Sequence, residues 1–465
     1  MLRKESSHRQ PACLQSLLLA PFAGWHLVGA ICLVMGVGGV AAAQKSDNRP
    51  LNMADAVRAA VETHPSIRGA GEQVEQARAG VDAARAGYRP QITGGIENQF
   101  NSYRNSSYDS RGIYTAKLSG SQMVYDFGKV AGDVRKAQSG VRASEAQVEQ
   151  AADEVALNTA QAWIDAHLQQ LLVQITREQL DAVQSITALV AERVAKGATP
   201  RSDVEQANSR VEAVRSQLLG AEAEALRASL ALMHLTGRTT PVVITGDIPA
   251  ILQGAACRYG VEEDTPAVRM ASARRDQARA DLDIAKAEGL PTVTLDGSVG
   301  YALTNGSRLY GEYRTTGQIG FNVTMPFYQG GRVKAQERGA IHQLRAYEDA
   351  VQQARLEMLQ GFADAKAQAD GWAQRAPVLT TRVDSINATR ALYRQQYLQL
   401  GTRTLLDLLN AEQEYNSARI DQAQGAHMQY RLGAQCLYFS DRMRSTFGLE
   451  NVRPNVGPLI SGRGE

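Results

Sequence analysis

The sequence has few of the features that compact enzymes and nucleic-acid-binding proteins depend on. Aromatic residues make up only 6% of the 465 residues, which is few for the core of a compact globular domain. The formal net charge is +2, so there is no basic surplus to bind nucleic acid. The seven histidines are scattered without metal-ligand spacing, and neither a phosphate-binding loop nor a nucleophile motif occurs. We therefore expect no catalytic residues, no metal site, no cofactor and no nucleic-acid partner.

Long apolar runs are also missing, with one exception near the N-terminus. Basic residues precede an apolar stretch at residues 27–40, and three alanines ending at Ala43 follow it. This order is typical of a secretory signal, so we expect residues 1–43 to be a signal peptide. A membrane anchor is the alternative, but the stretch is shorter than the roughly 20 residues of a spanning helix. The surroundings of Cys32 do not resemble a lipoprotein site, so no lipid anchor is expected.

The remaining sequence contains one pattern twice. The segment around Pro65 recurs around Pro266, and the segment 197–203 recurs as 401–407. The offset is roughly 200 residues, far beyond the period of a solenoid, so each copy is a whole assembly of secondary structure. We expect two tandem repeats with a linker and a tail. The expected boundaries are 51–240 for repeat 1, 241–260 for the linker, 261–449 for repeat 2 and 450–465 for the C-terminal tail.

Only two cysteines lie beyond the expected signal peptide. Cys257 lies in the linker and Cys436 lies near the end of repeat 2. An exported protein meets an oxidising compartment, so a disulfide between them is allowed. Sequence alone cannot show whether two cysteines are close in space. Between a disulfide and two unpaired buried thiols, we favour the unpaired thiols.

Four short runs alternate between apolar and polar residues, which is the pattern of strands with one apolar and one polar face. The expected strands are about 91–103 and 114–126 in repeat 1, and about 292–303 and 316–328 in repeat 2. Each is about as long as the 9–11 residues with which a tilted strand crosses a bilayer. Four strands cannot close a barrel, and open edges in lipid are strongly unfavourable. If the strands span a membrane, several chains must share one barrel, and three copies would supply roughly twelve strands.

Long helices fill most of each repeat. The segment 129–196 lacks proline and has small or apolar residues at steps of three and four, which predicts one helix of roughly 100 Å. A second long helix is expected over about 333–397, with a kink at Pro377. Glycines at 197 and 401 stop these helices before a new helix start, so two tight helical hairpins are expected.

Together these features resemble the TolC-type outer-membrane factors, which are export channels of Gram-negative bacteria. The resemblance covers about residues 51–449. It is carried by the repeated strand pair and long helix, by Tyr125-Asp126-Phe127-Gly128 and Phe327-Tyr328-Gln329-Gly330-Gly331, and above all by Gly401-Thr402-Arg403-Thr404-Leu405-Leu406-Asp407. It implies a mixed α and β membrane protein. Its homotrimer would form a 12-stranded β-barrel in the outer membrane, continued by a long α-helical tunnel into the periplasm.

The resemblance assigns roles to the two hairpin turns, which match the periplasmic tip where such tunnels close. Arg403 matches a gate arginine, and Ser202 and Asp203 match its hydroxyl and acidic partners. Asp407 matches the first aspartate of an acidic ring at the entrance. Capping and solvated surface charge are the simpler explanation for Asp203, Arg403 and Asp407, and the residues alone favour it. The turn residues expected to dock a periplasmic adaptor protein are Gly197, Gly401, Thr402 and Thr404.

Two departures from the family pattern put a full copy of this gate in question. Asn410 stands where the second ring aspartate would be, which makes the expected ring less negative. Leu398 stands where a gate tyrosine would be, and Tyr397 is displaced from that position by one residue.

The resemblance also implies partners and a cargo. The partners would be a periplasmic adaptor, an inner-membrane ABC transporter or other pump, outer-membrane lipid and an exported protein. The expected cargo is a large protein toxin such as an adenylate cyclase-haemolysin, exported by type I secretion. Efflux of drugs or small molecules is the alternative. A secreted structural coiled coil or adhesin is a more remote alternative, because it leaves the four alternating runs unexplained.

Overall fold

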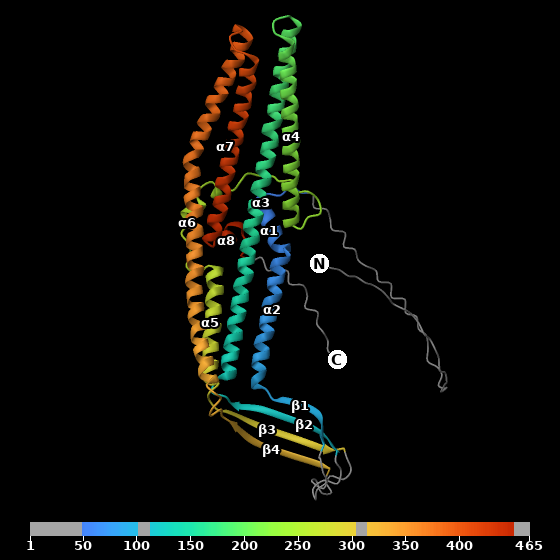
Figure 1. The fold of residues 1–465 in the computed structure, drawn as a ribbon, viewed down its shortest axis with the longest axis vertical. Coiled ribbons are helices and arrows are strands. Elements are labelled where there is room, and N and C mark those ends of the chain that lie inside the picture. Colours follow the sequence, from blue (N-terminus) through green and yellow to red (C-terminus); the bar gives the residue numbers. More distant parts are fainter. Residues whose placement is uncertain (1–48, 101–111, 304–313, 451–465) are drawn as a thin grey trace, which may run out of the picture. The chain divides into compact units, whose positions relative to one another are not determined.

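The computed structural model describes residues 49–100, 112–303 and 314–450. The expected signal peptide, most of the two loops within the strand pairs and nearly all of the tail lie outside these residues. In the described part of the chain, each repeat contains a shorter helical section, two strands and a long helical hairpin, in that order (Figure 1). No helix among the described residues combines the length and apolar character that crossing a membrane requires.

Repeat 1 begins with two helices that a proline separates. His64 has an extended backbone (ψ 130°) because the following Pro65 disfavours the helical conformation there, and Pro65 itself opens the next helix. The elements of repeat 1 are α1 (Met53–Thr63), α2 (Pro65–Arg85), the short 3-10 helix η1 (Ala86–Tyr88), β1 (Gln91–Phe100), β2 (Gly112–Tyr125), α3 (Lys129–Ala195) and α4 (Arg201–Leu235).

The segment 125–128 turns the chain from β2 into α3. The buried Asp126 side chain accepts hydrogen bonds from the backbone N–H groups of Gly128 (2.9 Å) and Val130 (2.6 Å), which satisfies donors that a helix N-terminus leaves free. Gly128 has a left-handed backbone (φ 93°), which glycine adopts without strain. The aspartate and the glycine of this motif are therefore explained by the local turn.

Repeat 2 follows the same plan with different details. Its elements are α5 (Pro266–Ala287), β3 (Thr292–Ala302), β4 (Thr315–Thr324), α6 (Arg332–Gln395), the π-helical turn η5 (Gln396–Leu400), α7 (Leu405–Phe439) and α8 (Met443–Phe447). The linker contains the 3-10 turns η2 (Ala250–Leu252) and η3 (Ala256–Arg258). Strand β4 ends four residues earlier than expected, because Pro326 lacks an N–H to donate to a ladder. Helix α6 continues through Pro377 as one helix.

The four strands form one antiparallel sheet in the order β1-β2-β3-β4. The register places Leu118 opposite both Gly94 and Val299, so the apolar positions of all four strands share one face. On the other face, Lys117 pairs with Glu97 (3.2 Å), and Asp296 accepts a hydrogen bond from Ser121 (2.5 Å). Strands β1 and β4 are exposed along their whole length, and within the described residues no strand pairs with their outer edges.

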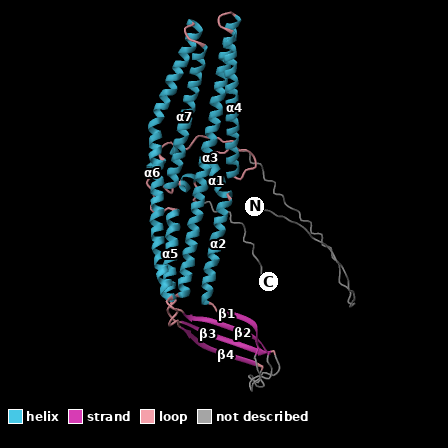
Figure 2. Ribbon diagram, in the orientation of Figure 1, coloured by secondary structure: helices cyan, strands magenta, loops and turns pink. Residues whose placement is uncertain are grey.

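The helices form two hairpins that run side by side (Figure 2). Helix α3 packs against α4 and α6 packs against α7, and the contact between α3 and α7 joins the two hairpins. At the strand end of α3 and α6, the shorter helices α2 and α5 cover them instead. The strands and the hairpin turns therefore lie at opposite ends of the long helices.

The main apolar core lies where the linker, α1 and α8 pack on the middle of α3 and the end of α7, and we call this region the belt. Trp163 of α3 is fully buried there, and its indole N–H donates to the carbonyl oxygen of Leu51 (3.1 Å). Leu51 in turn forms a parallel bridge with Ile244 of the linker.

The belt also overturns our expectation for the cysteines. Cys257 in η3 and Cys436 in α7 form a disulfide, with their Cα atoms 5.1 Å apart. The expectation of unpaired thiols was wrong because α7 runs back from its hairpin turn to the belt and brings its last turns against the linker. Gly433, one turn before Cys436, allows this approach, since a Cβ there would lie 2.8 Å from the Leu252 carbonyl oxygen.

Candidate functional site

The first hairpin turn joins α3 to α4. The N–H of Gly197 bonds to the Val194 carbonyl (2.9 Å) and the N–H of Ala198 bonds to the Arg193 carbonyl (2.8 Å), which together form a Schellman motif around the left-handed Gly197. The Thr199 hydroxyl donates to the Asp203 carboxylate (2.5 Å) across the start of α4. Asp203 is therefore partly engaged in its own turn, while Ser202 beside it is exposed.

The second hairpin turn joins α6 to α7. Helix α6 widens into the π-helical turn η5 and stops at the left-handed Gly401 (φ 62°). Thr404 and Asp407 then form a capping box: the Asp407 N–H donates to the Thr404 hydroxyl (3.2 Å), and the Thr404 N–H donates to the Asp407 carboxylate (3.1 Å). The hydrogen bonds from Thr404 hold the pKa of Asp407 below its usual range, so this carboxylate stays charged at neutral pH.

The structure does not bring the predicted gate residues together within one chain. The Arg403 guanidinium donates to the Gln396 side chain (3.1 Å) and stacks over the Tyr393 ring at 4.2 Å. Among the described residues, no ion pair joins Arg403 to Asp203. Gly197, Gly401, Thr402 and Thr404 are exposed at the two turns. Leu398 in η5 and Asn410 in α7 are also exposed.

A second apolar cluster lies just behind these turns and joins the two hairpins. We call it the tip cluster; its buried members are Val183, Ile186, Val190, Ala207, Val211, Val214, Tyr397, Leu405, Leu408 and Leu409. They come from α3, α4, η5 and α7, so both hairpins contribute. Separating the hairpin tips would expose this cluster to water.

Sequence reasoning missed a residue pair that joins Arg193 to a member of the tip cluster, Tyr397. Arg193 of α3 donates to the backbone carbonyl of Tyr397 (3.2 Å), and its guanidinium carbon lies 4.9 Å from the centre of the Tyr397 ring. One signal in the sequence could have identified Arg193. The spacing 183, 186, 190, 193 continues the three-four rhythm of buried α3 positions and places a charged residue where an apolar one is expected.

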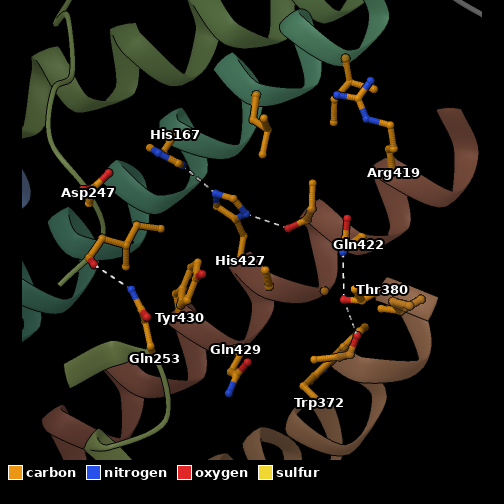
Figure 3. Close-up of a pocket in the computed structure, with 18 residues that line it drawn as sticks. His167, Asp247, Gln253, Trp372, Thr380, Arg419, Gln422, His427, Gln429 and Tyr430 are labelled. Atoms are coloured by element: carbon orange, nitrogen blue, oxygen red, sulfur yellow. Dashed lines mark hydrogen bonds between the residues drawn. The ribbon is translucent and has the colours of Figure 1, made fainter. Parts of the chain in front are cut away.

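A further group of polar residues lies in the belt, where α3 and α7 meet (Figure 3). His427 is buried, and its Nδ1 lies 2.7 Å from the Ala423 carbonyl oxygen. A carbonyl only accepts, so Nδ1 carries the proton and the Nε2 of neutral His427 is an acceptor. His167 Nδ1, 2.8 Å away, therefore donates to it. The pair borders a cavity of about 610 Å³ that Asp247, Trp372 and other residues line.

Burial controls how these histidines titrate. It lowers the pKa of both His167 and His427 from the usual value of 6.5, and the nearby Asp247 offsets part of this effect for His167 only. Both rings therefore favour the neutral form, which the hydrogen bond from His167 requires of His427. The described residues contain no group of three or more His, Cys, Asp or Glu side chains placed to hold a metal ion.

Comparison with protein families gives one match that covers both repeats. A family model described as "Outer membrane efflux protein" matches residues 56–238 and 259–432. The first segment lies in repeat 1 and the second begins at the end of the linker and runs through most of repeat 2. The unmatched interval is the linker that helps to form the belt.

Individual proteins with known roles are similar over most of the chain. Outer membrane efflux protein BepC of Brucella suis is 25% identical over 75% of this chain and 76% of its own length. Outer membrane protein TolC of Escherichia coli is 23% identical over 77% of each chain. Proteases secretion protein PrtF of Dickeya chrysanthemi is 23% identical over 79% of this chain and 83% of its own.

Solved structures share the fold. The outer-membrane channel OprN matches with a TM-score of 0.70 at 21% identity, over 83% of this chain and 89% of OprN. At this identity the likeness establishes the fold alone.

Proposed function

The chain belongs to the family of outer membrane efflux proteins, and on this premise we propose that three copies of it form one export channel through the outer membrane. The TolC-type resemblance predicted from the sequence is confirmed by the family match and by the similarity to TolC itself. The family consists of outer-membrane channels and not of enzymes. A secreted structural coiled coil or adhesin is therefore no longer a competing explanation.

The single observation that supports a shared channel is the open four-stranded sheet. Both of its edge strands are exposed along their length, and its apolar residues lie on one face. In lipid such edges must be paired, and three sheets placed edge to edge would give a closed barrel of about twelve strands. Its apolar faces would contact lipid, and the faces carrying Lys117 and Asp296 would line the lumen. A chemical cross-linking experiment on purified outer membranes should give a trimer as the largest discrete product.

In such a trimer the hairpin turns would meet around one axis and close the tunnel. Arg403 of the second turn would pair there with Asp203 beside the first turn. Both turns are exposed in the single chain. An exposed pair is worth only about 0–1 kcal/mol, but three related copies act together. A periplasmic adaptor would dock on Gly197, Gly401, Thr402 and Thr404. Its binding would shift the equilibrium between the closed and the open tip toward the open tip. Bilayer conductance that is the same for Arg403→Ser and the parent would remove the pair from the gate.

Asp407 would form the acidic ring at the tunnel entrance. Its lowered pKa keeps three carboxylates charged there, which favours cations as other acidic rings do. Asp407→Asn is the informative variant, because an asparagine oxygen can still accept from the Thr404 N–H while the charge is lost. Reversal potentials in asymmetric KCl should shift toward lower cation preference. Identical potentials in parent and variant would show that the ring does not select ions.

The cargo we propose is a large protein, exported in one step by type I secretion with an adaptor and an inner-membrane ABC transporter. An adenylate cyclase-haemolysin is the example that the sequence suggested. PrtF, a proteases secretion protein, supports this direction, whereas BepC, an efflux protein, supports the alternative of small-molecule efflux. A deletion strain separates them. Loss of one large secreted protein with unchanged drug tolerance is expected, and unchanged secretion with drug hypersensitivity would make the channel an efflux outlet.

A further inference from the structure

The seam between the two hairpins of one chain is crossed by a series of polar contacts. From the belt toward the tip they are Arg431–Asp165 (3.0 Å), His427–His167 (2.8 Å), Arg419–Glu178 (2.6 Å), Arg210–Gln413 (2.7 Å) and Arg193–Tyr397 (3.2 Å). In the last contact, Arg193 lies three residues before the C-cap of α3. If the hairpins separate from the tip, it is the first of these contacts that must break.

The Arg193 contact differs in kind from the other four. Its acceptor is the backbone carbonyl of Tyr397, one of the last four carbonyls of a helix that ends at Leu400, and these have no partner within the helix. A positive charge is favourable at a helix C-terminus. Arg193 thus caps the end of the second hairpin's helix from a helix of the first hairpin. The same guanidinium lies over the ring of Tyr397, a residue that is 5% exposed.

The surroundings make this cap dependent on a closed tip. Tyr397 belongs to the tip cluster, so its ring is held in place by residues of α3, α4 and α7. Moving the second hairpin outward would take the Tyr397 ring and carbonyl away from Arg193 together. The capping interaction and the burial of the tip cluster therefore favour the same, closed arrangement.

The contact is also incompletely satisfied. Among the described residues, neither the Arg193 Nε nor the Tyr397 hydroxyl has a hydrogen-bond partner, although both atoms are buried. A buried polar atom without a partner lowers stability. The cap therefore holds the tip less tightly than a fully paired contact would, which suits an interaction that must be released during opening.

We propose that Arg193 is a positioning residue of the closed state, and that losing its hold on Tyr397 is a required step in opening the tunnel. This inference rests on the proposed channel function. It concerns the contact between the two hairpins of one chain. The pair of Arg403 and Asp203 would instead join hairpins of different chains around the tunnel axis. The tyrosine contributes its ring and carbonyl, and its hydroxyl plays no part.

The experiment compares single-channel currents of purified variants in planar lipid bilayers. Arg193→Ala should raise the mean current severalfold, because the cap and the ring contact are both lost. Arg193→Lys keeps a charged donor but loses the planar guanidinium, and should lie between Ala and the parent. Tyr397→Phe keeps ring and carbonyl and should behave as the parent does. The matched control is Arg177→Ala, which removes an arginine of the same helix that pairs with Glu222 inside its own hairpin (2.8 Å).

Each outcome decides the proposal. Parent-like current from Arg193→Ala, or an open channel from Tyr397→Phe alone, would overturn it. If Arg193→Ala yields no assembled trimer, Arg193→Met, which fills the space but cannot donate, is measured instead, and parent-like current from it would equally overturn the proposal. A parent protein that forms no channel at all would refute the proposed function itself. A conducting parent with an unchanged Arg193 variant would refute only the role of Arg193.

Discussion

At the scale of single residues, burial determines which protonation state the belt residues adopt. His167 and His427 lie far apart in the sequence and form one hydrogen-bonded pair between α3 and α7. The hydrogen bond needs His427 to be neutral, because protonated His427 would have no acceptor to offer, whereas His167 donates from Nδ1. Nearby in the belt, Asp153 of α3 is buried, and its carboxylate lies 3.3 Å from the Arg444 guanidinium. Glu149 and Asp441 form ion pairs with the same guanidinium. The two sites respond to pH in opposite directions.

Lowering the pH from about 7.5 to about 5.5 should destabilise the protein through the histidine pair. Burial lowers the pKa of both rings from 6.5, so the unfolded state binds more protons than the folded state in this range, and stability falls as the pH falls. Each unit by which a pKa is lowered costs about 1.4 kcal/mol at low pH. Thermal unfolding midpoints in detergent measure the effect. The double variant His167→Asn/His427→Asn should lose less stability over the same range, and an equal loss would contradict the assignment.

Asp153 should have the opposite dependence. Burial outweighs the shared Arg444 and raises the pKa of Asp153 from 3.8 to about 7. Between pH 3.8 and about 7 the folded state therefore binds a proton at Asp153 that the unfolded state does not. The contribution of Asp153 to stability is lost as the pH rises through about 7. Asp153→Asn cannot titrate, so it should lower the stability of the protein less at about pH 8 than at about pH 6. A pH-independent difference between parent and variant would show that this carboxyl does not titrate there.

At the scale of elements, the structure shows how the ends of the helices are held. The hairpin turns use local devices, a Schellman motif after α3 and a capping box before α7. The far end of α7 is held instead by the linker, through the disulfide between Cys257 and Cys436. This bond closes a sequence separation of 179 residues and joins the inter-repeat linker to the last helix of repeat 2.

Reducing this disulfide should destabilise the belt. A cross-link across so long a loop restricts the unfolded chain, and loop-entropy arguments give an effect of about 5 kcal/mol as an upper value. The thermal unfolding midpoint should fall when the purified protein is treated with dithiothreitol, with thiol titration to show that the bond has opened. Cys257→Ser/Cys436→Ser should already have the lower midpoint and should not respond to the reductant. An unchanged midpoint in the fully reduced parent would show that the linker is held by packing alone.

At the scale of the whole molecule, one chain provides an incomplete sheet and two complete helical hairpins. The hairpins bury apolar residues in the belt and in the tip cluster, so they are stabilised within the chain. The sheet has no second layer among the described residues, and large apolar residues such as Phe321 (75% exposed) stay on its surface. In the proposed channel, lipid and neighbouring copies would supply the contacts that stabilise it.

A pair of neighbouring substitutions tests which face meets lipid. Phe321 and Asn322 are adjacent in β4 and point to opposite faces, with Phe321 opposite Leu295 in the register. Phe321→Lys places a charge on the proposed lipid face, which costs about 2–4 kcal/mol per chain near the middle of a bilayer. Asn322→Lys places the same charge in the lumen and should be tolerated. The yield of trimer in outer membranes is the readout, and equal yields for both variants would contradict the orientation.

The sequence by itself determined the features that depend on local physical chemistry. The alternation of apolar residues fixed the four strands and their faces, since side chains of a strand point alternately to its two sides. The glycines at 197 and 401 located the ends of the long helices, because glycine adopts the left-handed conformation of a helix stop without strain. The internal repeat indicated the shared plan of the two halves, with a strand pair followed by a long helical hairpin in each. The turn around Arg403 and Asp407 carried enough detail to predict the family.

Only the tertiary structure decided which distant residues meet. It paired Cys257 with Cys436, placed His167 beside His427, and brought Arg193 onto the end of the helix that carries Tyr397. It also showed that Arg403 and Asp203 do not pair within a single chain. Spacing along one helix predicts which of its residues share a face. Which residue of another helix faces them depends on how the hairpins pack, and that packing is a property of the whole set of apolar contacts in the belt and the tip cluster.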